Sequence, residues 1–188
     1  MEVPEFTLFL VPVGDEDVEV MEHLQVELAK LGARVLREER VPAPEDAYDR
    51  RRDQYKARAF LRLLGAYEGD RMLGVTDRDL YMHGLRFVFG QAEAPGRAAV
   101  ISLNRLKWGG DVDMFLDRCV KEATHELGHT FGLRHCENPM CVMHFSVSLN
   151  DTDTKSSRFC KTCRKELVTA RENEAEAKLE QLEDRRLR

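Results

Sequence analysis

The chain has 188 residues, of which 43% are hydrophobic and 34% charged, and its formal net charge at neutral pH is −5. This length favours one domain with a sizeable core, and the negative balance gives no sign of a nucleic-acid surface. No apolar run is long enough to span a membrane. The N-terminus shows neither a secretory signal nor an evident propeptide, so we expect a cytoplasmic monomer made without a zymogen stage.

The first third of the chain predicts a strand, a helix and a second strand. Residues 6 to 13 form a short apolar run rich in β-formers, which predicts a buried strand. Residues 15 to 31 carry apolar side chains at helical spacing, and Gly32 is placed to end that helix. Residues 33 to 36 predict a second strand. This order favours a right-handed crossover and parallel pairing.

Residues 45 to 64 predict a second helix, because Tyr55, Ala59 and Leu63 would fall on one face. The same segment is rich in arginine. The arginines most simply form a solvated face, and phosphate binding is the alternative. They are Arg50, Arg51, Arg52, Arg58 and Arg62.

The middle of the chain predicts three further strands, at residues 72 to 76, 86 to 89 and 98 to 103. Asp77 and Asp79 follow the first of these strands, where a loop or capping role is favoured over cation binding. Residues 104 to 110 end in two glycines and predict a loop.

The next element is predicted to be a helix that begins near Asp111 or Asp113 and runs to about Phe131. In such a helix His125 and His129 stand one turn apart on the same face. Two imidazoles at this spacing can bind one metal ion.

A third histidine follows in a position to join them. Gly132, three residues after His129, can take a left-handed backbone and end the helix, so that the chain turns back and brings His135 to the same metal. Three neutral nitrogens leave a fourth tetrahedral position open, which is typical of a catalytic zinc. Glu126 is then placed to act as general base on the attacking water. The alternative is a helix whose surface histidines bind nothing.

The complete pattern H-E-x-x-H-x-x-G-x-x-H resembles the signature of the metzincin metallopeptidases. The resemblance implies a methionine on a tight turn beneath the metal, and Met143 is predicted in that role, with Met140 as the competitor. Phe145 stands where the astacin-like branch has a tyrosine, so no phenol is available there. The resemblance also implies an edge strand that pairs with extended substrate, for which we expect Arg86, Phe87, Val88, Phe89 and Gly90.

Four of the five cysteines form two close pairs, which are Cys136 with Cys141 and Cys160 with Cys163. Such pairs suit a structural zinc, whereas disulfides are the less favoured alternative in a cytoplasmic chain. Because Cys136 directly follows His135, a second zinc would tie down the loop that presents the third histidine. Cys119 lies too far from these residues to join either set and is predicted to be core.

The run H-E-x-x-H-x-x-G-x-x-H-C, followed by C-x-M and C-x-x-C, is similar to the archaemetzincin family over residues 125 to 163. It implies a minimal metzincin-like α/β (α+β) domain with a mixed twisted sheet, an active-site helix and a zinc-stapled C-terminal part. It also implies two zinc ions and hydrolysis of peptides. A peptide-binding pseudo-peptidase with little turnover is the alternative. A purely structural zinc protein is disfavoured, since it would not need Glu126.

We place the catalytic domain, with its four-cysteine site, in residues 1 to 163 and a charged helix in residues 164 to 188. That helix lacks Gly and Pro and carries one apolar stripe, which is predicted to pack on the domain through Leu167, Val168, Ala175, Leu179 and Leu182. A partner-binding role for the helix is the alternative.

Overall fold

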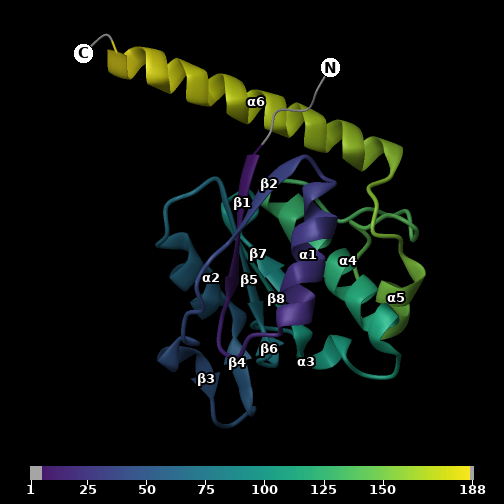
Figure 1. Ribbon diagram of the computed structural model, residues 1–188. Helices are drawn as coiled ribbons and strands as arrows, with labels where there is room; N and C mark the ends of the chain where they lie inside the picture. Colours follow the sequence, from purple (N-terminus) through teal and green to yellow (C-terminus); the bar gives the residue numbers. More distant parts are fainter. Residues whose placement is uncertain (1–5, 187–188) are drawn as a thin grey trace.

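A computed structural model describes residues 6 to 186 of the protein (Figure 1). The elements follow one another along the chain as β1 Phe6–Pro12, α1 Val18–Ala29, β2 Ala33–Arg37, η1 Glu45–Ala47, β3 Tyr48–Asp49, β4 Gln54–Lys56, α2 Ala57–Gly65, β5 Arg71–Thr76, β6 Leu80–Tyr81, β7 Gly90–Ala92, β8 Ala98–Ser102, α3 Leu103–Leu106, α4 Val112–Thr130, α5 Leu149–Thr154 and α6 Lys161–Arg186.

The main sheet has five strands in the order β2-β1-β5-β8-β7. The pairs β1–β2, β1–β5 and β5–β8 are parallel, whereas β7 pairs with β8 in the antiparallel sense and forms one edge. The predicted parallel crossover from β1 to β2 is confirmed. Gly32 lies between α1 and β2 and has φ +75°, a backbone conformation that glycine adopts without strain. The mixed α/β fold expected from the sequence is therefore present.

The sheet lies between two helical layers, and each face has its own apolar core. On one face, α1 and α4 pack over side chains such as Leu8, Leu10 and Ile101. On the other face, α2 buries Phe60 and Leu64 against Val100. Figure 1 shows α2 on the opposite side of the sheet from α1 and α4. The layer that contains α4 carries the functional site.

The predicted helix over residues 45 to 64 is wrong in its first half. Tyr48 and Tyr55 pair across a short antiparallel hairpin instead, with ring centroids 5.1 Å apart. The turn between them includes Asp53 at φ +53°. The segment Asp-Arg-Arg-Arg-Asp has no apolar side chain that a helix could bury. A hairpin instead lets the two tyrosine rings pack against each other across the strands. The helix begins only at Ala57.

The strand predicted over residues 86 to 89 is also displaced. The regular strand is β7, which begins at Gly90, and within the preceding run Val88 forms only an isolated bridge to Leu80. Arg86 cannot continue a ladder here because its carbonyl oxygen accepts hydrogen bonds from the side chains of Arg52 and Gln54. The predicted loop after β8 begins with one helical turn, α3, capped by the Ser102 side chain.

The C-terminal helix α6 packs on the body only over its first part. Leu167 is buried, Arg171 donates to the carbonyl oxygens of Leu31 and Gly32, and Arg71 pairs with Glu174. The predicted apolar contact fails further along, because two members of the stripe stay largely exposed, Leu179 at 62% and Leu182 at 54%. Figure 1 shows this end of α6 reaching past the rest of the protein. Among the described residues, no helix is long and apolar enough to cross a membrane.

Candidate metal centres

Helix α4 positions the first two predicted histidines. Its N-cap, Asp111, accepts a hydrogen bond from the Met114 backbone N–H at 2.9 Å, and the helix runs unbroken to Thr130. His125 is buried and His129 is half-buried, and their rings meet edge to face with centroids 4.6 Å apart. The one-turn spacing read from the sequence therefore places both imidazoles on one face of a well-anchored helix.

The chain turns sharply after α4 and returns with the third histidine. Gly132 has φ +87°, and its N–H donates to the His129 carbonyl oxygen at 2.8 Å. The Leu133 N–H donates to the Gly128 carbonyl oxygen, which closes the helix end. His135 then stands with its Nε2 3.2 Å from Nε2 of His129, whose Nε2 is also 3.1 Å from that of His125.

The three nitrogens fit a tetrahedral zinc site. Zinc–nitrogen bonds of 2.0–2.1 Å place two ligand nitrogens about 3.3 Å apart on a tetrahedron. The Nε2 atom of His129 is 3.1 Å from that of His125 and 3.2 Å from that of His135, close to that spacing, and all three ligand atoms lie within 4.8 Å of one another. The arrangement could hold a metal ion through three nitrogens of the described residues, and three protein ligands would leave a fourth tetrahedral position for substrate or water.

Hydrogen bonds fix the orientation of the two helical imidazoles. Nδ1 of His125 is 2.8 Å from the Val142 carbonyl oxygen, and Nδ1 of His129 is 2.7 Å from the Leu133 carbonyl oxygen. An Nδ1–H that donates to a carbonyl leaves the Nε2 lone pair for a metal. Burial lowers the pKa of His125 and of His129, and it also lowers the pKa of His135. Neutral rings are the form that binds zinc.

Glu126 lies on the same helix, with its carboxylate against the edge strand. A Cβ added to Gly90 would lie 2.6 Å from Cγ and 2.7 Å from Oε1 of Glu126. Only glycine therefore allows β7 to approach this side chain so closely. Burial raises the pKa of Glu126 well above the ordinary carboxyl value, and the neighbouring Glu122 raises it further. Such a carboxyl group, buried beside the histidines, has the environment of a proton-transfer residue.

Met143 packs under the histidine helix. It is fully buried, and a Cβ on Gly128 would lie only 2.4 Å from its Sδ. Met140, the competing residue, is 56% exposed. Phe145 is partly exposed, and its ring centroid is 4.7 Å from that of His135.

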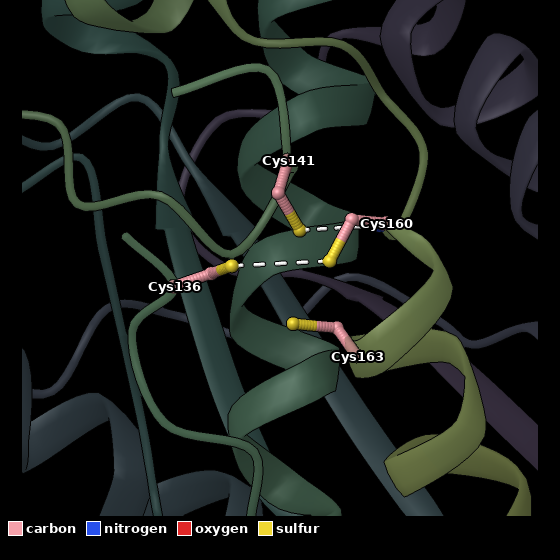
Figure 2. A group of neighbouring side chains, drawn as sticks. All are labelled: Cys136, Cys141, Cys160 and Cys163. Atoms are coloured by element: carbon pink, nitrogen blue, oxygen red, sulfur yellow. Dashed lines mark hydrogen bonds between the residues drawn. The ribbon is translucent and has the colours of Figure 1, made fainter. Parts of the chain in front are cut away.

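The four predicted cysteines converge in a second cluster (Figure 2). Cys136 and Cys141 come from the loop after α4, whereas Cys160 precedes α6 and Cys163 lies in its first turn. All four Sγ atoms lie within 4.8 Å of one another, and those of Cys136 and Cys160 are 3.8 Å apart. Zinc–sulfur bonds of 2.3 Å predict a spacing of about 3.8 Å on a tetrahedron, so the thiol set also fits zinc. The Cys163 backbone N–H lowers the pKa of Cys160 to about 7.

Hydrogen bonds within one loop connect the two clusters. The Cys136 N–H donates to the Met143 carbonyl oxygen at 2.9 Å, and the His144 ring nitrogen Nδ1 is 2.8 Å from the Cys136 carbonyl oxygen. Val142, which directly precedes Met143, orients His125 through its carbonyl group. The loop that carries two of the cysteines therefore also supports a histidine of the first cluster.

A cavity of 240 Å³ lies beside His125 and Glu126. All five residues predicted for substrate binding line it, although only Gly90 belongs to a regular strand. Sequence reasoning missed the opposite wall, which includes Glu122 and residues 145 to 147. Glu122 stands one helical turn before Glu126, so the i, i+4 spacing was a signal that could have found it.

Three other residues considered from the sequence lie outside these clusters. Cys119 is fully buried in the core, as predicted. Asp79 holds Arg105 through two hydrogen bonds of 2.7 Å, and the Asp77 carbonyl oxygen accepts from Asn104. The loop role favoured for the two aspartates therefore agrees with the structure.

The sequence matches the model of peptidase family M54 over residues 3 to 169. Curated relatives named archaemetzincin include one from Methanopyrus kandleri, 53% identical over 135 residues, which covers 71% of this chain and 77% of the relative. Another, from Pyrococcus furiosus, is 41% identical over 175 residues and covers 85% of this chain and 91% of the relative.

Solved structures give the same match. The crystal structure of archaemetzincin from Methanopyrus kandleri superposes with a TM-score of 0.83 at 43% identity, covering 88% of this chain and 95% of the other. That of archaemetzincin from Archaeoglobus fulgidus complexed with malonate has a TM-score of 0.79 at 37% identity, covering 85% and 99%.

Proposed function

This chain belongs to peptidase family M54, the archaemetzincins, and we propose that it hydrolyses peptide bonds at the three-histidine cluster with Glu126 as general base. It is a zinc metallopeptidase. One observation carries the assignment of roles. Three histidine nitrogens converge within 4.8 Å of one another, two pairs at zinc-ligand spacing, beside a buried carboxyl group and a cavity large enough for a substrate side chain.

In this proposal His125, His129 and His135 hold the catalytic zinc. When bound, the ion would polarise the scissile carbonyl group and lower the pKa of a bound water to about 7. The carbonyl oxygens of Val142 and Leu133 keep two of the rings in the tautomer that presents Nε2.

Glu126 is the proposed proton carrier. Its carboxylate takes a proton from the attacking water and passes it to the leaving amine. Gly90 lets the edge strand pack against this side chain, so the carboxylate has little freedom to turn away from the histidines. Its burial raises its pKa, and a higher pKa makes it a stronger base.

We assign a second zinc to Cys136, Cys141, Cys160 and Cys163. Four thiolates complete a tetrahedron and leave no position for substrate, so this ion is structural. Met143 acts as the floor beneath the catalytic site, since its Sδ lies against the helix at Gly128. The catalytic unit would then end at Cys163, with most of α6 as an extension.

Substrate is proposed to lie extended along β7. The Phe89 carbonyl oxygen accepts a hydrogen bond from the Ser102 backbone N–H, and the Glu93 N–H donates to the Ala98 carbonyl oxygen. The backbone groups of Phe89 and Glu93 therefore point toward β8. With a strand period of two, the backbone groups of Gly90 and Ala92 face the free edge. Pairing at these two residues gives affinity with little demand on sequence, and the neighbouring cavity takes one substrate side chain.

The test is a digest of a mixed peptide library by zinc-loaded wild type, Glu126→Gln and the control Glu180→Gln, whose carboxylate is exposed on α6. Loss of the general base should lower cleavage by roughly two to four orders of magnitude while the zinc content stays unchanged. The control should cleave like the wild type. Cleavage by Glu126→Gln at the wild-type rate would refute the mechanism. A wild type that binds peptides but cleaves none would favour the pseudo-peptidase.

A further inference from the structure

A buried ion pair lies beside the cavity and has no part in the proposed proton transfer. Lys155 is fully buried, and its Nζ lies 2.9 Å from Oε1 of Glu122, whose side chain is 4% exposed. The same oxygen accepts a hydrogen bond from Thr152, and Lys155 also donates to the His144 carbonyl oxygen. Because Glu122 lines the cavity, one face of this ion pair borders the space beside the histidines.

Lys155 and Thr152 both contact the same oxygen of the Glu122 carboxylate, Oε1. Because Glu122 also lines the cavity, Oε2 is the carboxylate oxygen that we consider for a ligand there. The surrounding wall is largely apolar and includes Phe87, Val88 and Val147. The cavity therefore combines apolar sides with one hydrogen-bond acceptor.

We propose that Glu122 determines specificity by accepting a hydrogen bond from a tyrosine side chain of the peptide substrate. The proposal rests on the function proposed above, because it assumes that the cavity receives a residue next to the scissile bond. The aromatic ring would fill the apolar part, and the hydroxyl group would donate to Oε2.

Charge favours a neutral donor over a cationic one. Lys155 already neutralises Glu122, so a substrate lysine would bring a buried charge without a counterion. Arg86 at the cavity wall adds a further positive charge. A phenol gains the hydrogen bond without this penalty, whereas phenylalanine would leave the acceptor without a partner.

The position of Glu122 also suits the length of tyrosine. Substrate backbone paired at Gly90 would lie next to Glu126, which packs against that glycine. Glu122 is one turn earlier on α4, about 6 Å along the helix axis. A tyrosine side chain spans a comparable length between its backbone and its hydroxyl oxygen.

The test uses blocked alanine pentapeptides with a central Tyr, Phe, Leu or Lys, so that one large side chain competes for the cavity. Their dissociation constants are measured by NMR titration of zinc-loaded Glu126→Gln protein, which keeps the cavity and prevents turnover. The Tyr peptide should bind roughly tenfold or more tightly than the Phe peptide, as expected for a hydrogen bond to a charged group. The Lys peptide should bind more weakly than the Tyr peptide.

The matched variant adds Glu122→Leu and Lys155→Met, which replace both charges by apolar side chains of similar size and avoid leaving either one unpaired. The Tyr-to-Phe ratio should fall to about one. A Glu122→Gln variant, which keeps the volume, should show a reduced ratio, and Glu180→Gln should keep the wild-type ratio. Equal binding of the Tyr and Phe peptides, a preference for Lys, or a preference for Tyr that survives the paired replacement would overturn the proposal.

Cleavage by the wild type separates this proposal from the function on which it rests. Selective binding of Tyr peptides without hydrolysis would support the role of Glu122 and count against the peptidase mechanism. Hydrolysis that proceeds equally well for Tyr and Phe peptides would support the mechanism and overturn the role of Glu122.

Discussion

The three-histidine cluster and the four-cysteine cluster share a loop but present opposite surroundings. His125 lines a cavity together with Glu126 and Gly90 of the edge strand, and His135 is exposed. The four cysteine Sγ atoms lie within 4.8 Å of one another, and the carboxyl groups of Glu137 and Glu166, which line the hollow beside them, are exposed. The number of protein ligands and the neighbouring base, rather than the presence of a metal, therefore distinguish a reactive site from a stabilising one.

The two clusters also differ in how the chain assembles them. The histidines lie within eleven residues, on one helix and the turn that follows it. The cysteines join two segments of the chain, and Cys141 of the first segment lies 19 residues before Cys160 of the second. Helix α6 begins at Lys161, directly after Cys160. A metal at the cysteines would therefore stabilise tertiary structure, whereas a metal at the histidines would be carried by an element that is already folded.

The largest effect is expected from Cys160→Ser. Removing one ligand of a closed site loses binding free energy that is also folding free energy, so unfolding should become easier by at least about 3 kcal/mol, roughly 10 °C in melting temperature. His129→Ala should release the catalytic zinc with a smaller thermal shift. Calorimetry and metal analysis on both variants check this, and equal small shifts would contradict the distinction.

The next effect is expected from Gly128→Ala. Alanine favours a helix interior by about 1 kcal/mol over glycine, but here its Cβ would meet Met143 Sδ at 2.4 Å. The displacement should weaken zinc binding at the histidines roughly 10- to 100-fold, as loss of a supporting contact does, and leave the cysteine site loaded. Gly65→Ala is the control, because its Cβ would meet only Glu93, at 3.6 Å. Unchanged zinc affinity would show that Met143 is not a rigid floor.

A smaller effect, confined to catalysis, is expected from Gly90→Ala. The added methyl group would lie 2.6 Å from Cγ of Glu126 and 2.8 Å from the Val100 carbonyl oxygen, so both Glu126 and β7 must shift, while none of these contacts is with a proposed metal ligand. Cleavage should fall about tenfold, a fraction of the loss expected on removing the base, while both zinc ions remain. Steady-state kinetics with metal analysis measures this, and full activity would mean that the position of Glu126 does not depend on β7.

The smallest effect is expected at the far end of α6, which begins at the cysteine cluster but extends past the body. Leu179→Ser and Leu182→Ser should change the free energy of unfolding by no more than about 0.5 kcal/mol, because both side chains are already exposed. Chemical denaturation checks this. A loss above 1 kcal/mol would mean that this end of the helix has a stabilising partner.

Local patterns predicted much of the fold and of both clusters. Strands β1, β5 and β8 are continuous apolar runs, and α4 has its cap at Asp111 and its terminating glycine at Gly132. Ligand spacing along one helix or within one loop is fixed by backbone geometry, so the histidines and the cysteine pairs could be read directly.

The errors arose where tertiary contacts decide the structure. The hairpin at Tyr48 and Tyr55 replaces the first half of the predicted helix, where residues 49 to 53 offer no apolar side chain to bury. The run before Gly90 is held instead by hydrogen bonds from the side chains of Arg52 and Gln54 to the Arg86 carbonyl oxygen. The pair of Glu122 with Lys155 joins residues 33 positions apart, so no local pattern could match the two partners.

The most direct measurement is a stepwise chelator titration that follows zinc content, peptide cleavage and melting temperature on the same samples. Cleavage should disappear as the first zinc leaves the histidines, while the melting temperature stays nearly constant. The melting temperature should then fall as the second zinc leaves the cysteines. Cleavage that persists after the first zinc has gone, or unfolding that accompanies its loss, would contradict the division of roles between the two clusters.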